Sequence, residues 1–391
     1  MNIAYILNAT VPTGGATKAF INMLEGVMQY GVRPFVVVPD KDGVYLQLQK
    51  MNIPTLAVTY RASAYPPCQT PKQRLLFIFK LAARIIANHR ATKILTTWLK
   101  ENKIDIVHSN TGVVRIGFDA AQKARIPHVY HIREYADKIG IHYFPTKASF
   151  VNQLGHCRSY SICITKSVQD YYHQVGKDNL SRVIYDGVFS ELPAMPTAQN
   201  KNYFLYAGRI QPAKGLDLLL EAYKQYADKS ATPIHLKVAG SNGDDAYYQK
   251  QLAYIKDNGL TELVELLGNV DDITSLMREA RALIVSSPFE GFGFCMPEAM
   301  QQGSLVIGRN TSGTKEQLDN ALDMTGQEIA LRYETAEQLT GLLSEVADNP
   351  LSHYDNYTRK AFEVVNQLYT KENHAKKVYE FYNAVLNGKD I

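Results

Sequence analysis

The chain has 391 residues, of which 46% are hydrophobic and 20% are charged, and its formal net charge at pH 7 is +4. This length exceeds one ordinary domain, and the composition is typical of a soluble globular protein, so we expect two domains. The mild charge does not indicate a nucleic-acid partner. There is no apolar run of the roughly 20 residues that cross a bilayer and no signal-peptide pattern, so we expect a cytoplasmic protein.

The first half of the chain alternates predicted strands with predicted helices. Apolar runs predict strands at 3–7, 34–38, 53–58, 105–110, 127–135, 161–165 and 182–188. Helical patterns are found at 16–30 and 71–103. This alternation is typical of a parallel sheet covered by helices.

A glycine pair, Gly14-Gly15, follows the first predicted strand and precedes the first predicted helix. Unpaired amides at a helix N-terminus can bind an anion such as a phosphate. The pair is not a Walker loop, since no Gly-Lys-Ser/Thr follows, and it lacks the GxGxxG fingerprint. Taken alone, it therefore favours an ordinary strand-to-helix turn over a ligand loop.

Metal-binding patterns are weak in this sequence. The segment Asp40–Asp42 matches the Asp-x-Asp that holds a divalent metal in nucleotide-sugar enzymes of another architecture. It ends in Gly43, however, and such Asp-rich segments are common in turns, so we favour a turn. No CxxC spacing joins the cysteines, which are Cys68, Cys157, Cys163 and Cys295. Neither a zinc site nor a disulfide framework is therefore predicted.

The predicted helix within 72–103 is strongly basic, with eight lysines and arginines against one acid, Glu101. A basic helix with Leu, Ile and Phe on its other face can lie on an anionic membrane surface. The alternative is a crossover helix whose apolar face packs on the sheet and whose lysines are merely solvated. We favour this alternative, and the membrane contact stays open as the second interpretation.

Polar side chains end two of the predicted strands in the first half. Asn110 ends one of them, while His131 and Arg133 end the other and, being two residues apart, lie on the same strand face. Ligands of open parallel sheets bind at the carboxyl ends of the strands. These three residues are therefore candidates for a binding site.

A second series of strands follows a polar, proline-containing linker at about 189–202. Its strands are predicted at 203–210, 234–239, 264–267, 282–286 and 305–308, and helices are predicted over the remainder. The two series predict an α/β protein of two Rossmann-like domains, 1–188 and 203–372, whose parallel sheets face each other across a cleft. We expect the last helix, about 373–391, to cross back to the first domain.

The stretch 287–300 holds two glutamates, Glu290 and Glu298, on either side of a glycine-aromatic turn. A buried strand is predicted before it, and Pro297 should open a short helix that ends at Gly303. Glu290 would then lie in a loop at a strand's carboxyl end. Glu298 would lie in the first turn of a helix, where the dipole favours a negative charge. This combination predicts a site for a polyhydroxylated molecule that carries phosphate.

Together these features resemble the retaining glycosyltransferases of family 4, also called group 1, which have the GT-B fold. The resemblance covers nearly the whole chain and is strongest over 203–316. Each motif is weak alone, and their co-occurrence in the expected order is strong. The motifs are Gly14-Gly15, Tyr185-Asp186-Gly187-Val188, Ala207-Gly208-Arg209, Lys214-Gly215, and Glu290 and Glu298 with seven residues between them.

The resemblance implies a role for each residue of the second half that matches a motif. Arg209 and Lys214 would clamp the diphosphate of a nucleotide sugar, because Arg offers a fixed fork and Lys a mobile point charge. Glu290 would contact the hydroxyls of the donor sugar, and Glu298 would accept hydrogen bonds from the ribose. The backbone near Val270 would read the base. The other donor-binding candidates are Gly14, Gly15, Gly208, Gly240, Gly291, Phe292, Gly293 and Phe294.

Structural explanations exist for the same residues. Glu298 could simply cap a helix dipole, Arg209 could form a surface salt bridge, and Lys214 could be solvated. We prefer the functional interpretation because the motifs occur together, and we take Glu290, Arg209 and Lys214 as the catalytic candidates. The resemblance also implies front-face transfer, in which the leaving phosphate helps to deprotonate the incoming hydroxyl. No protein nucleophile is therefore assigned, and the two glutamates are not a glycosidase pair.

The sequence departs from the family near 131–134. Many relatives have a histidine at the position where this chain has Arg133, while His131 stands two residues earlier. Arg133 could contact a phosphate-bearing acceptor or the donor diphosphate, or it could pair structurally with Glu134. We group His131, Arg133 and Asn110 on the acceptor side.

The predicted function is metal-independent, retaining transfer of a hexose-type unit from a UDP- or GDP-sugar to a hydroxyl acceptor, with no other cofactor. The expected acceptor is a growing cell-surface glycan or a lipid-linked glycan. The protein would be cytoplasmic, with a peripheral position at the inner face of the plasma membrane as the further option. Two alternatives are a GT-B sugar-nucleotide epimerase and a non-enzymatic two-domain sugar-binding protein, which would normally carry an export signal.

Overall fold

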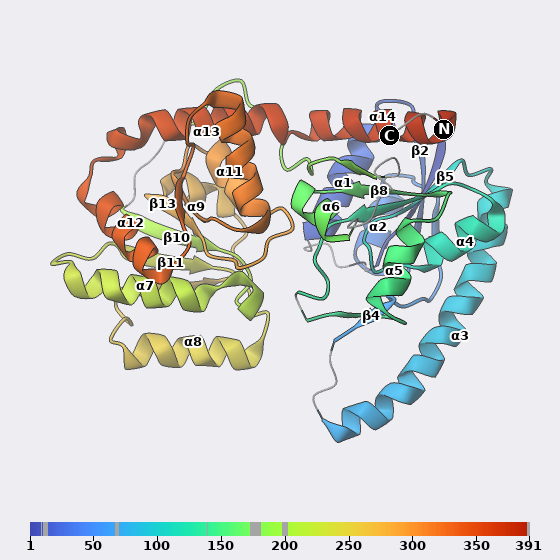
Figure 1. The fold of residues 1–391 in the computed structure, drawn as a ribbon, viewed down its shortest axis with the longest axis horizontal. Coiled ribbons are helices and arrows are strands. Elements are labelled where there is room, and N and C mark those ends of the chain that lie inside the picture. The colour runs from blue at the N-terminus through green and yellow to red at the C-terminus, as the bar shows by residue number, and fades with distance from the viewer. Residues whose placement is uncertain are drawn as a thin grey trace. The chain divides into compact units, whose positions relative to one another are not determined.

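The computed structural model describes residues 1–8, 10, 15–66, 70–138, 140–172, 181–197 and 202–388, with only the backbone of Arg74. The chain divides into two compact units. The first contains Met1–Gly187 together with Lys371–Ile391, and the second contains Val188–Thr370. Figure 1 shows that each unit is a sheet of strands packed against helices.

The first unit, as far as it is described, is built on a seven-stranded parallel sheet in the order β3-β2-β1-β5-β6-β8-β9. In β1, Ile3 and Tyr5 point to one face and Ala4 and Ile6 to the other, and all four are buried. A parallel strand covered on both faces has this continuous apolar pattern. The strands are β1 (Asn2–Ile6), β2 (Arg33–Val38), β3 (Thr55–Ala57), β5 (Ile106–Ser109), β6 (His128–Ile132), β8 (Ser159–Cys163) and β9 (Ser181–Val183).

Helices from both ends of the chain cover this sheet. One face is covered by α1 (Gly15–Met28), α2 (Val44–Lys50) and α14 (Lys371–Asn387). From α14, Phe381 and Tyr382 are fully buried in the same cluster as Phe20 of α1. The other face is covered by the last part of α3 (Pro71–Glu101) and by α4 (Ile116–Ala124). The remaining elements of this unit are β4 (Ala64–Tyr65), β7 (His142–Tyr143), α5 (Lys147–Leu154) and α6 (Lys166–Tyr172).

The second unit contains, among its described residues, a six-stranded parallel sheet in the order β12-β11-β10-β13-β14-β15. The strands are β10 (Tyr203–Ala207), β11 (His235–Ala239), β12 (Val264–Gly268), β13 (Ala282–Val285), β14 (Val306–Arg309) and β15 (Leu331–Tyr333). One apolar cluster joins these strands to α7 (Leu216–Lys229) and α12 (Ala336–Asp348). The other helices are η2 (Pro212–Lys214), α8 (Asp245–Asp257), α9 (Ile273–Glu279), α10 (Cys295–Gln301), α11 (Ser312–Thr325), η3 (Leu351–Tyr354) and α13 (Asp355–Leu368).

Each sheet has a point where the strand order reverses, and this point predicts where a ligand binds. In the first sheet β1 lies between β2 and β5, and in the second sheet β10 lies between β11 and β13. The connections leave the two central strands in opposite directions, which opens a crevice at their carboxyl ends. Asn110 follows β5 directly, and Glu290 lies in the loop that follows β13. Candidate residues therefore lie at the reversal point of each sheet.

The predicted α/β class with parallel sheets is confirmed, two local predictions were wrong, and one small sheet was not predicted. The last part of the chain is not wholly helical, because β15 adds a strand to the second sheet. The helix after the glycine-aromatic turn begins at Cys295, not at Pro297, and ends at Gln301. Proline is tolerated there because the first amides of a helix have no intrahelical acceptor. The short sheet of β4 and β7 was not predicted, since two-residue strands carry no periodic pattern.

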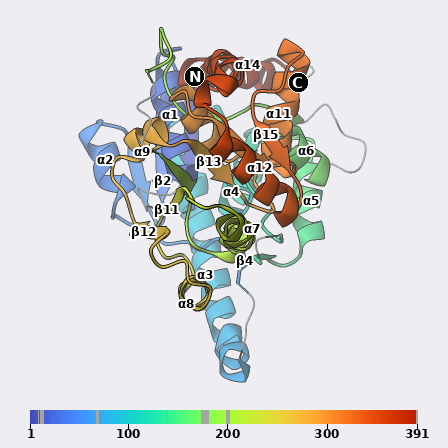
Figure 2. The same cartoon turned by 90° about the vertical axis from the view of Figure 1, so that its left-hand side faces the viewer.

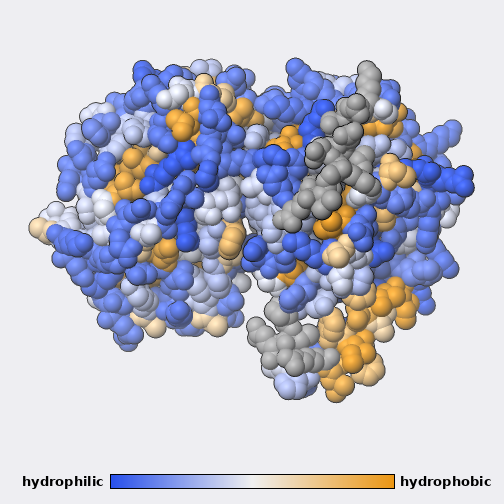
Figure 3. Space-filling view, viewed as in Figure 1, coloured by the Kyte–Doolittle hydropathy of each residue, from blue (hydrophilic) through white to orange (hydrophobic). Residues whose placement is uncertain are grey.

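The long basic helix α3 packs on the sheet only in its last part. Ala91, Leu95 and Leu99 are fully buried against the first unit's core, as the preferred interpretation requires. Over 71–90, by contrast, no side chain that the structure describes is buried. Figures 1 and 2 both show this part of α3 extending away from the sheet of its unit. Figure 3 shows an apolar area at its end, so the crossover-helix interpretation was wrong for this part.

Among the described residues, no helix has both the length and the apolar character needed to pass through a bilayer.

The packing of α14 on the first sheet predicts that Phe381→Ala destabilises the first unit. Removing a fully buried phenylalanine leaves a cavity, and we expect the free energy of unfolding to fall by about 3–5 kcal/mol. Trp98, the only tryptophan, lies in α3 and reports on this unit when urea unfolding is followed by fluorescence. The control is Leu386→Ala on the same helix, where the side chain is 41% exposed and a change within about 0.5 kcal/mol is expected. Equal effects of the two substitutions would contradict the packing.

Candidate functional site

Two loops meet at the carboxyl edge of the second sheet because β10 and β13 are neighbours in it. Their backbones touch at Gly215, where an added Cβ would lie 2.2 Å from the carbonyl oxygen of Ser286. The φ of Gly215 is +64°, a conformation that favours glycine. In the same place the Ser286 hydroxyl donates to the carbonyl oxygen of Lys214 at 3.1 Å. The loop after β10 is therefore fixed against the loop after β13.

The contact between these loops brings Lys214 and Glu290 together. The Lys214 Nζ donates to Glu290 Oε1 at 2.6 Å, and the Ser287 hydroxyl donates to the same oxygen at 2.7 Å. The exposed fraction of the side chain is 26% for Lys214 and 9% for Glu290. Burial alone would lower the pKa of Lys214, but the Glu290 carboxylate more than offsets this, so the pKa lies above its usual value. The result is a largely buried ion pair of one fixed carboxylate and one ammonium.

Helix α11 holds the Glu290 loop from the other side. The Gly313 amide donates to the carbonyl oxygen of Glu290 at 3.0 Å, and the Thr311 hydroxyl donates to that of Pro288 at 3.2 Å. Further along, the Gln317 amide donates to the carbonyl oxygen of Phe292. Because each of these bonds ends on the backbone of the loop, they set the position of Glu290 independently of its side chain.

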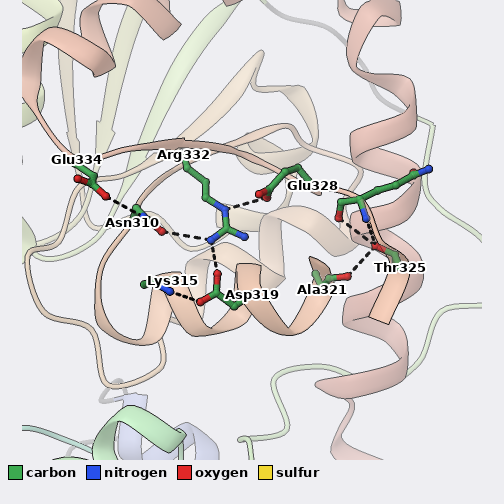
Figure 4. Close-up of polar contacts among 9 residues, drawn as sticks. Asn310, Lys315, Asp319, Ala321, Thr325, Glu328, Arg332 and Glu334 are labelled. Carbon is green, nitrogen blue, oxygen red and sulfur yellow. Dashed lines mark hydrogen bonds and ion pairs between the residues drawn. The ribbon is translucent and has the colours of Figure 1, made fainter. Parts of the chain in front are cut away.

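A charged network in turn fixes α11 to the edge of the sheet (Figure 4). Arg332 on β15 donates to Asp319 of α11 at 2.5 Å and to Glu328 at 2.9 Å. Lys315 pairs with the same Asp319 carboxylate. Burial would raise the pKa of Asp319, but the two cations outweigh it and hold the pKa below its usual value. This network is structural, and it anchors the helix that positions the Glu290 loop.

Phe292 of the predicted donor loop is a core residue. It is 3% exposed, and its ring packs edge-on against Tyr369 with ring centroids 5.0 Å apart and against Phe294 at 5.8 Å. Gly293 beside it has φ +84°. The side chain of Phe292 is thus part of the core, so only the backbone groups of this residue can serve a ligand.

The remaining predicted donor residues lie on the loops around the same sheet edge. Arg209 is exposed, and its guanidinium is in no ion pair within the described part of the chain. Gly208 and Gly240 are packed backbone to backbone, since a Cβ on Gly240 would lie 1.9 Å from the carbonyl oxygen of Gly208. Val270, after β12, is half-buried. Within the residues that the structure describes, Arg209 therefore has no salt bridge, and Lys214 is paired with Glu290 instead of being merely solvated.

Glu298 lies in the first turn of α10 and is half-buried. The same helix starts with Cys295, whose thiol has its pKa raised to about 12 by burial and by the nearby Glu290 carboxylate. A thiol with this pKa stays protonated at neutral pH and is a poor nucleophile. The Cys295 thiol is therefore not suited to act as a nucleophile at neutral pH.

In the first unit, the three predicted residues Asn110, His131 and Arg133 lie together. Arg133 donates to the carbonyl oxygen of Asn110 at 3.3 Å and from Nη2 to His131 Nδ1 at 3.1 Å. Arg133 also forms an ion pair with Asp186, and both side chains are at least 95% buried. Because a guanidinium can only donate, Nδ1 of His131 accepts, and the ring proton lies on Nε2, which is 3.7 Å from the Asp186 carboxylate.

The histidines of this cluster are neutral. Burial, and after it the charge of Arg133, lowers the pKa of His131 and His108 well below the usual value. The His108 Nδ1 contacts the Tyr382 hydroxyl at 2.7 Å, and the His374 Nδ1 contacts the carbonyl oxygen of Tyr185 at 2.6 Å. The buried charges in this cluster are therefore those of Arg133 and Asp186.

The suggested pairing of Arg133 with Glu134 was wrong. The partner of Arg133 is Asp186, which the strand-end motif at 185–188 delivers from the other side of β8. The physical reason is that β6 ends at Ile132 and the Arg133 guanidinium beyond it is bonded to Asp186, Asn110 and His131. Of the glycine pair, Gly15 is the first residue of α1, and Gly14 lies outside the described residues.

The Asp40–Asp42 segment forms a turn. The Asp40 carboxylate accepts hydrogen bonds from the Thr10 hydroxyl at 2.5 Å and from the amide of Asp42 at 3.1 Å. This is the Asx-turn pattern in which an aspartate binds the backbone two residues on. In the described part of the chain, no group of three or more His, Cys, Asp or Glu side chains could hold a metal ion.

Two residues of these clusters were not among the predicted site residues. Ser287 lies three residues before Glu290, and Asp186 belongs to the motif at 185–188. A signal existed for Asp186, because an acid that ends an apolar strand needs a cation, and Arg133 ends another strand of the same sheet. For Ser287 the sequence has no distinctive signal, since serine is common in loops.

Comparison with known families matches both halves of the chain. The family model described as "Glycosyl transferases group 1" matches residues 191–364, and the model described as "Glycosyltransferase Family 4" matches residues 13–191. Together the two matches cover the loops that hold Lys214, Glu290 and Arg133.

Characterised and uncharacterised relatives agree with these matches. An uncharacterized glycosyltransferase of Methanocaldococcus jannaschii is 27% identical over 236 residues, which are 58% of this chain and 62% of the relative. A lipopolysaccharide 1,2-N-acetylglucosaminetransferase of Salmonella typhimurium is 30% identical over 191 residues, 47% of this chain and 48% of the relative. The chain thus spans about half to three fifths of the length of these curated relatives.

Among solved structures, HepE of Anabaena in complex with UDP has a TM-score of 0.75 at 19% identity, over 98% of this chain and 100% of that one. The same protein was also solved with UDP-glucose, with a TM-score of 0.74. At this identity the likeness shows the fold, and the fold is GT-B, as predicted.

The position of Glu134 predicts a pH-dependent stability. Burial raises the pKa of its carboxyl to about 7, and Arg133 opposes this only in part. A raised acid pKa means that the folded chain binds the proton more tightly than the unfolded chain, so stability falls as the pH rises from about 4.5 to about 7. We expect Glu134→Gln, which stays neutral, to gain melting temperature relative to wild type over this range.

Thermal unfolding of both proteins between about pH 5 and about pH 8 measures this difference. The control is Glu25→Gln on the exposed side of α1, for which the difference from wild type should not change with pH. If the melting temperature of Glu134→Gln minus that of wild type does not change with pH, or decreases as the pH rises, the carboxyl of Glu134 is not held neutral by its surroundings.

Proposed function

The chain belongs to the group 1 glycosyltransferases of family 4, and from that premise we propose that it is a retaining hexosyltransferase that uses a nucleotide-diphosphate sugar as donor. The observation that carries this proposal is the ion pair of Lys214 and Glu290 at the reversal point of the second sheet. Such a point in an open α/β sheet is where nucleotides bind. The second unit is accordingly the donor-binding domain, and the first is the acceptor domain.

Arg209 and Lys214 are suited to the leaving group. A nucleoside diphosphate gains negative charge as the bond from sugar to phosphate breaks, and fixed cations stabilise that charge. The exposed guanidinium of Arg209 offers two parallel donors to phosphate oxygens, while Lys214 is already held in place by Glu290. These two cations can compensate the diphosphate charge without a metal, so we propose a metal-independent reaction.

Glu290 has two uses in this proposal. Its Oε1 accepts from Lys214 and Ser287, which leaves lone pairs of the carboxylate available for hydroxyls of the donor sugar. At the same time it keeps Lys214 charged and pointing into the site before the donor arrives. Glu298, at the positive end of α10, is proposed to hold the ribose, and Val270 to lie beside the base. Gly208, Gly240 and the amides of Gly291–Phe294 complete the donor-binding loops.

The reaction is proposed to proceed by front-face transfer. The acceptor hydroxyl attacks the anomeric carbon from the side of the departing diphosphate, whose oxygen takes the hydroxyl proton. The new glycosidic bond then has the configuration of the donor, and no residue of the chain forms a covalent intermediate. The Cys295 thiol, with its pKa raised to about 12, fits this account because it is a poor nucleophile.

In the first unit, Arg133 and Asp186 act as a structural pair in this proposal. Because both are buried in one ion pair, they are proposed to position His131 and Asn110 at the carboxyl edge of the first sheet. A direct contact of Arg133 with a phosphate would have to break that pair. We therefore assign a positioning role to Arg133 and propose that the acceptor binds near the strand ends at Asn110 and His131.

The relatives guide the choice of substrates. The solved neighbour was crystallised with UDP and UDP-glucose, and one curated relative is named for lipopolysaccharide synthesis. We propose a UDP-sugar as the first donor to test, ahead of a GDP-sugar, and a cell-surface glycan or a lipid-linked glycan as acceptor. The proposal includes a cytoplasmic location for the protein.

The first test is selective binding of the nucleotide. A ligand that binds only the folded chain stabilises it by about 2.7 kcal/mol at a hundred times its dissociation constant, so UDP and UDP-glucose should raise the melting temperature. Arg209→Ala should remove most of this shift, whereas Arg359→Ala, an exposed arginine of α13, should keep it. Stabilisation by glucose alone, and by no nucleotide, would instead support a sugar-binding protein.

The second test is turnover. Glu290→Gln and Lys214→Ala should each lower the rate of sugar transfer by about a hundredfold or more, because each removes charge that acts on the breaking bond. The matched controls are Glu265→Gln and Lys237→Ala, which break an ion pair of 3.9 Å in the same unit and should leave the rate unchanged. In this pair Lys237 is half-buried and Glu265 is exposed.

Proton NMR of the transfer product measures its anomeric configuration, which should equal that of the donor. Inversion would exclude front-face transfer, and conversion of the donor without any acceptor would support the epimerase alternative. If a folded Glu290→Gln variant has a turnover near that of wild type, the proposed role of Glu290 in the site is wrong.

A further inference from the structure

The first part of α3 exposes an unusually apolar surface. The exposed fraction of the side chain is 63% for Leu75, 64% for Ile78 and 69% for Phe79, and Ile85 and Ile86 are about half exposed. With Leu76, Ala82 and Ala83, which are also exposed, these residues fill the outer side of three successive helical turns. Exposed apolar groups occur singly on most proteins, but a contiguous area of this kind marks a contact surface. We call these eight residues the α3 patch.

The inner side of the same helical segment is firmly attached to the first unit, so the patch is not a loose end. The Phe77 ring lies against Tyr65, with centroids 4.6 Å apart. Arg84 donates to the carbonyl oxygen of Ala64 at 2.9 Å, and the side-chain amide of Asn88 bonds both backbone groups of Arg61 at 2.9 Å. The helix therefore has a fixed inner side and an outer side that faces solvent.

The N-terminal end of the helix is also fixed by its sequence. Thr70 caps it, with its hydroxyl accepting from the amide of Gln73, while Gln73 bonds back to the amide of Thr70. Pro71 occupies the first helical position, where a missing amide has no cost. The helix is thus complete up to the end that carries the patch.

The charge around the patch has one sign. Between Asp42 and Glu101 the sequence contains no Asp or Glu, while the same 58 residues contain nine lysines and arginines. Four of the basic residues are exposed on α3 around the patch: one precedes it, one lies within its span, and two lie beyond its end. These are Lys72, Lys80, Arg90 and Lys93.

We propose that the α3 patch docks on a membrane surface that contains anionic lipids. The apolar side chains would enter the boundary between headgroups and acyl chains, and the four flanking basic side chains would lie at the level of the headgroups. Each lysine or arginine near an anionic leaflet favours binding, and the apolar side chains add a contribution that salt does not screen. In the described structure of this unit, the apolar side chains of the α3 patch are not part of the core, and the four basic side chains form no ion pair.

A second copy of the chain fits this surface less well. In a two-fold dimer each patch meets its own copy, so Lys72, Lys80, Arg90 and Lys93 would be brought against the same cations. Like charges at an interface are unfavourable, and no acidic residue lies within this part of the chain to compensate them. A surface with a basic rim and an apolar centre is therefore more complementary to an anionic bilayer than to a second copy of the same surface.

The inference rests on the proposed function only for the leaflet, since a cytoplasmic transferase would meet the inner one. Binding itself requires no transfer of sugar, so the two proposals can fail separately. An enzyme that transfers sugar but ignores vesicles would overturn only the docking surface. A chain that binds vesicles but no nucleotide would overturn only the proposed function.

The experiment is sedimentation of the full chain with vesicles of phosphatidylcholine alone and with vesicles of phosphatidylcholine and phosphatidylglycerol in equal parts. We expect binding to the anionic vesicles and at least tenfold weaker binding to the neutral ones. The double substitution Ile78→Ser with Phe79→Ser should weaken anionic binding by about tenfold or more, since it removes the two most exposed large apolar groups. Lys72→Gln with Lys80→Gln should weaken binding at low salt and should have little effect at high salt.

The matched control is Leu46→Ser on α2, an apolar side chain that is 57% exposed and lies outside the patch. It should bind vesicles as wild type does. Because all the substituted side chains are exposed, folding should be preserved, and an unchanged melting temperature with an unchanged shift by UDP verifies this for each variant.

Two results would overturn the proposal. One is equal vesicle binding by wild type and the Ile78→Ser, Phe79→Ser variant. The other is a dimer of the free wild-type chain in light scattering that becomes a monomer in this variant while vesicles bind neither protein. The second result would assign the α3 patch to a second copy of the chain.

Discussion

The ion pair of Lys214 and Glu290 is the constraint around which the second unit is organised. Burying a charge costs free energy unless an opposite charge or hydrogen bonds compensate it. If one partner of a buried ion pair is removed, the charge of the other partner stays buried without compensation. The structure meets this requirement with a second donor on the carboxylate, from Ser287, and with a loop whose backbone is bonded to α11 at several points. The network of Arg332 and Asp319 then secures α11 itself. Together these polar contacts hold one carboxylate in place.

The first unit uses the same device with different residues. Arg133 and Asp186 form a buried ion pair between a strand end and a later chain segment, as Lys214 and Glu290 do between two loops. In each unit the pair joins residues that are more than 50 positions apart in the sequence and lies where polar groups of several strands converge. Such pairs contribute little to stability, but they require a precise position of both side chains, because a misplaced partner leaves a buried charge without compensation. They are therefore well suited to fixing the shape of a site.

The sequence was informative about the fold because its strands are apolar on both faces and are separated by helical patterns. Nearly all strands of both sheets, and the motif loops after β10 and β13, could be located in this way. The pairing of Lys214 with Glu290 could not, since it depends on β10 and β13 being neighbours, which is a property of the strand order. The short β15 was missed because three residues carry no period. The outer side of α3 was misjudged because an apolar helix face reads the same in sequence whether it packs on a sheet or faces solvent.

The position of α14 has a consequence for how the protein is made. Phe381 and Tyr382 fill the core of the first unit beside Phe20, although the whole second unit separates them in the sequence. A ribosome therefore completes the second unit before it supplies the helix that closes the first sheet. Until then one face of that sheet, with its buried apolar strands, is partly uncovered in the nascent chain. The first domain to be synthesised is thus the last whose core can close, and the interval is one in which a chaperone has apolar surface to bind.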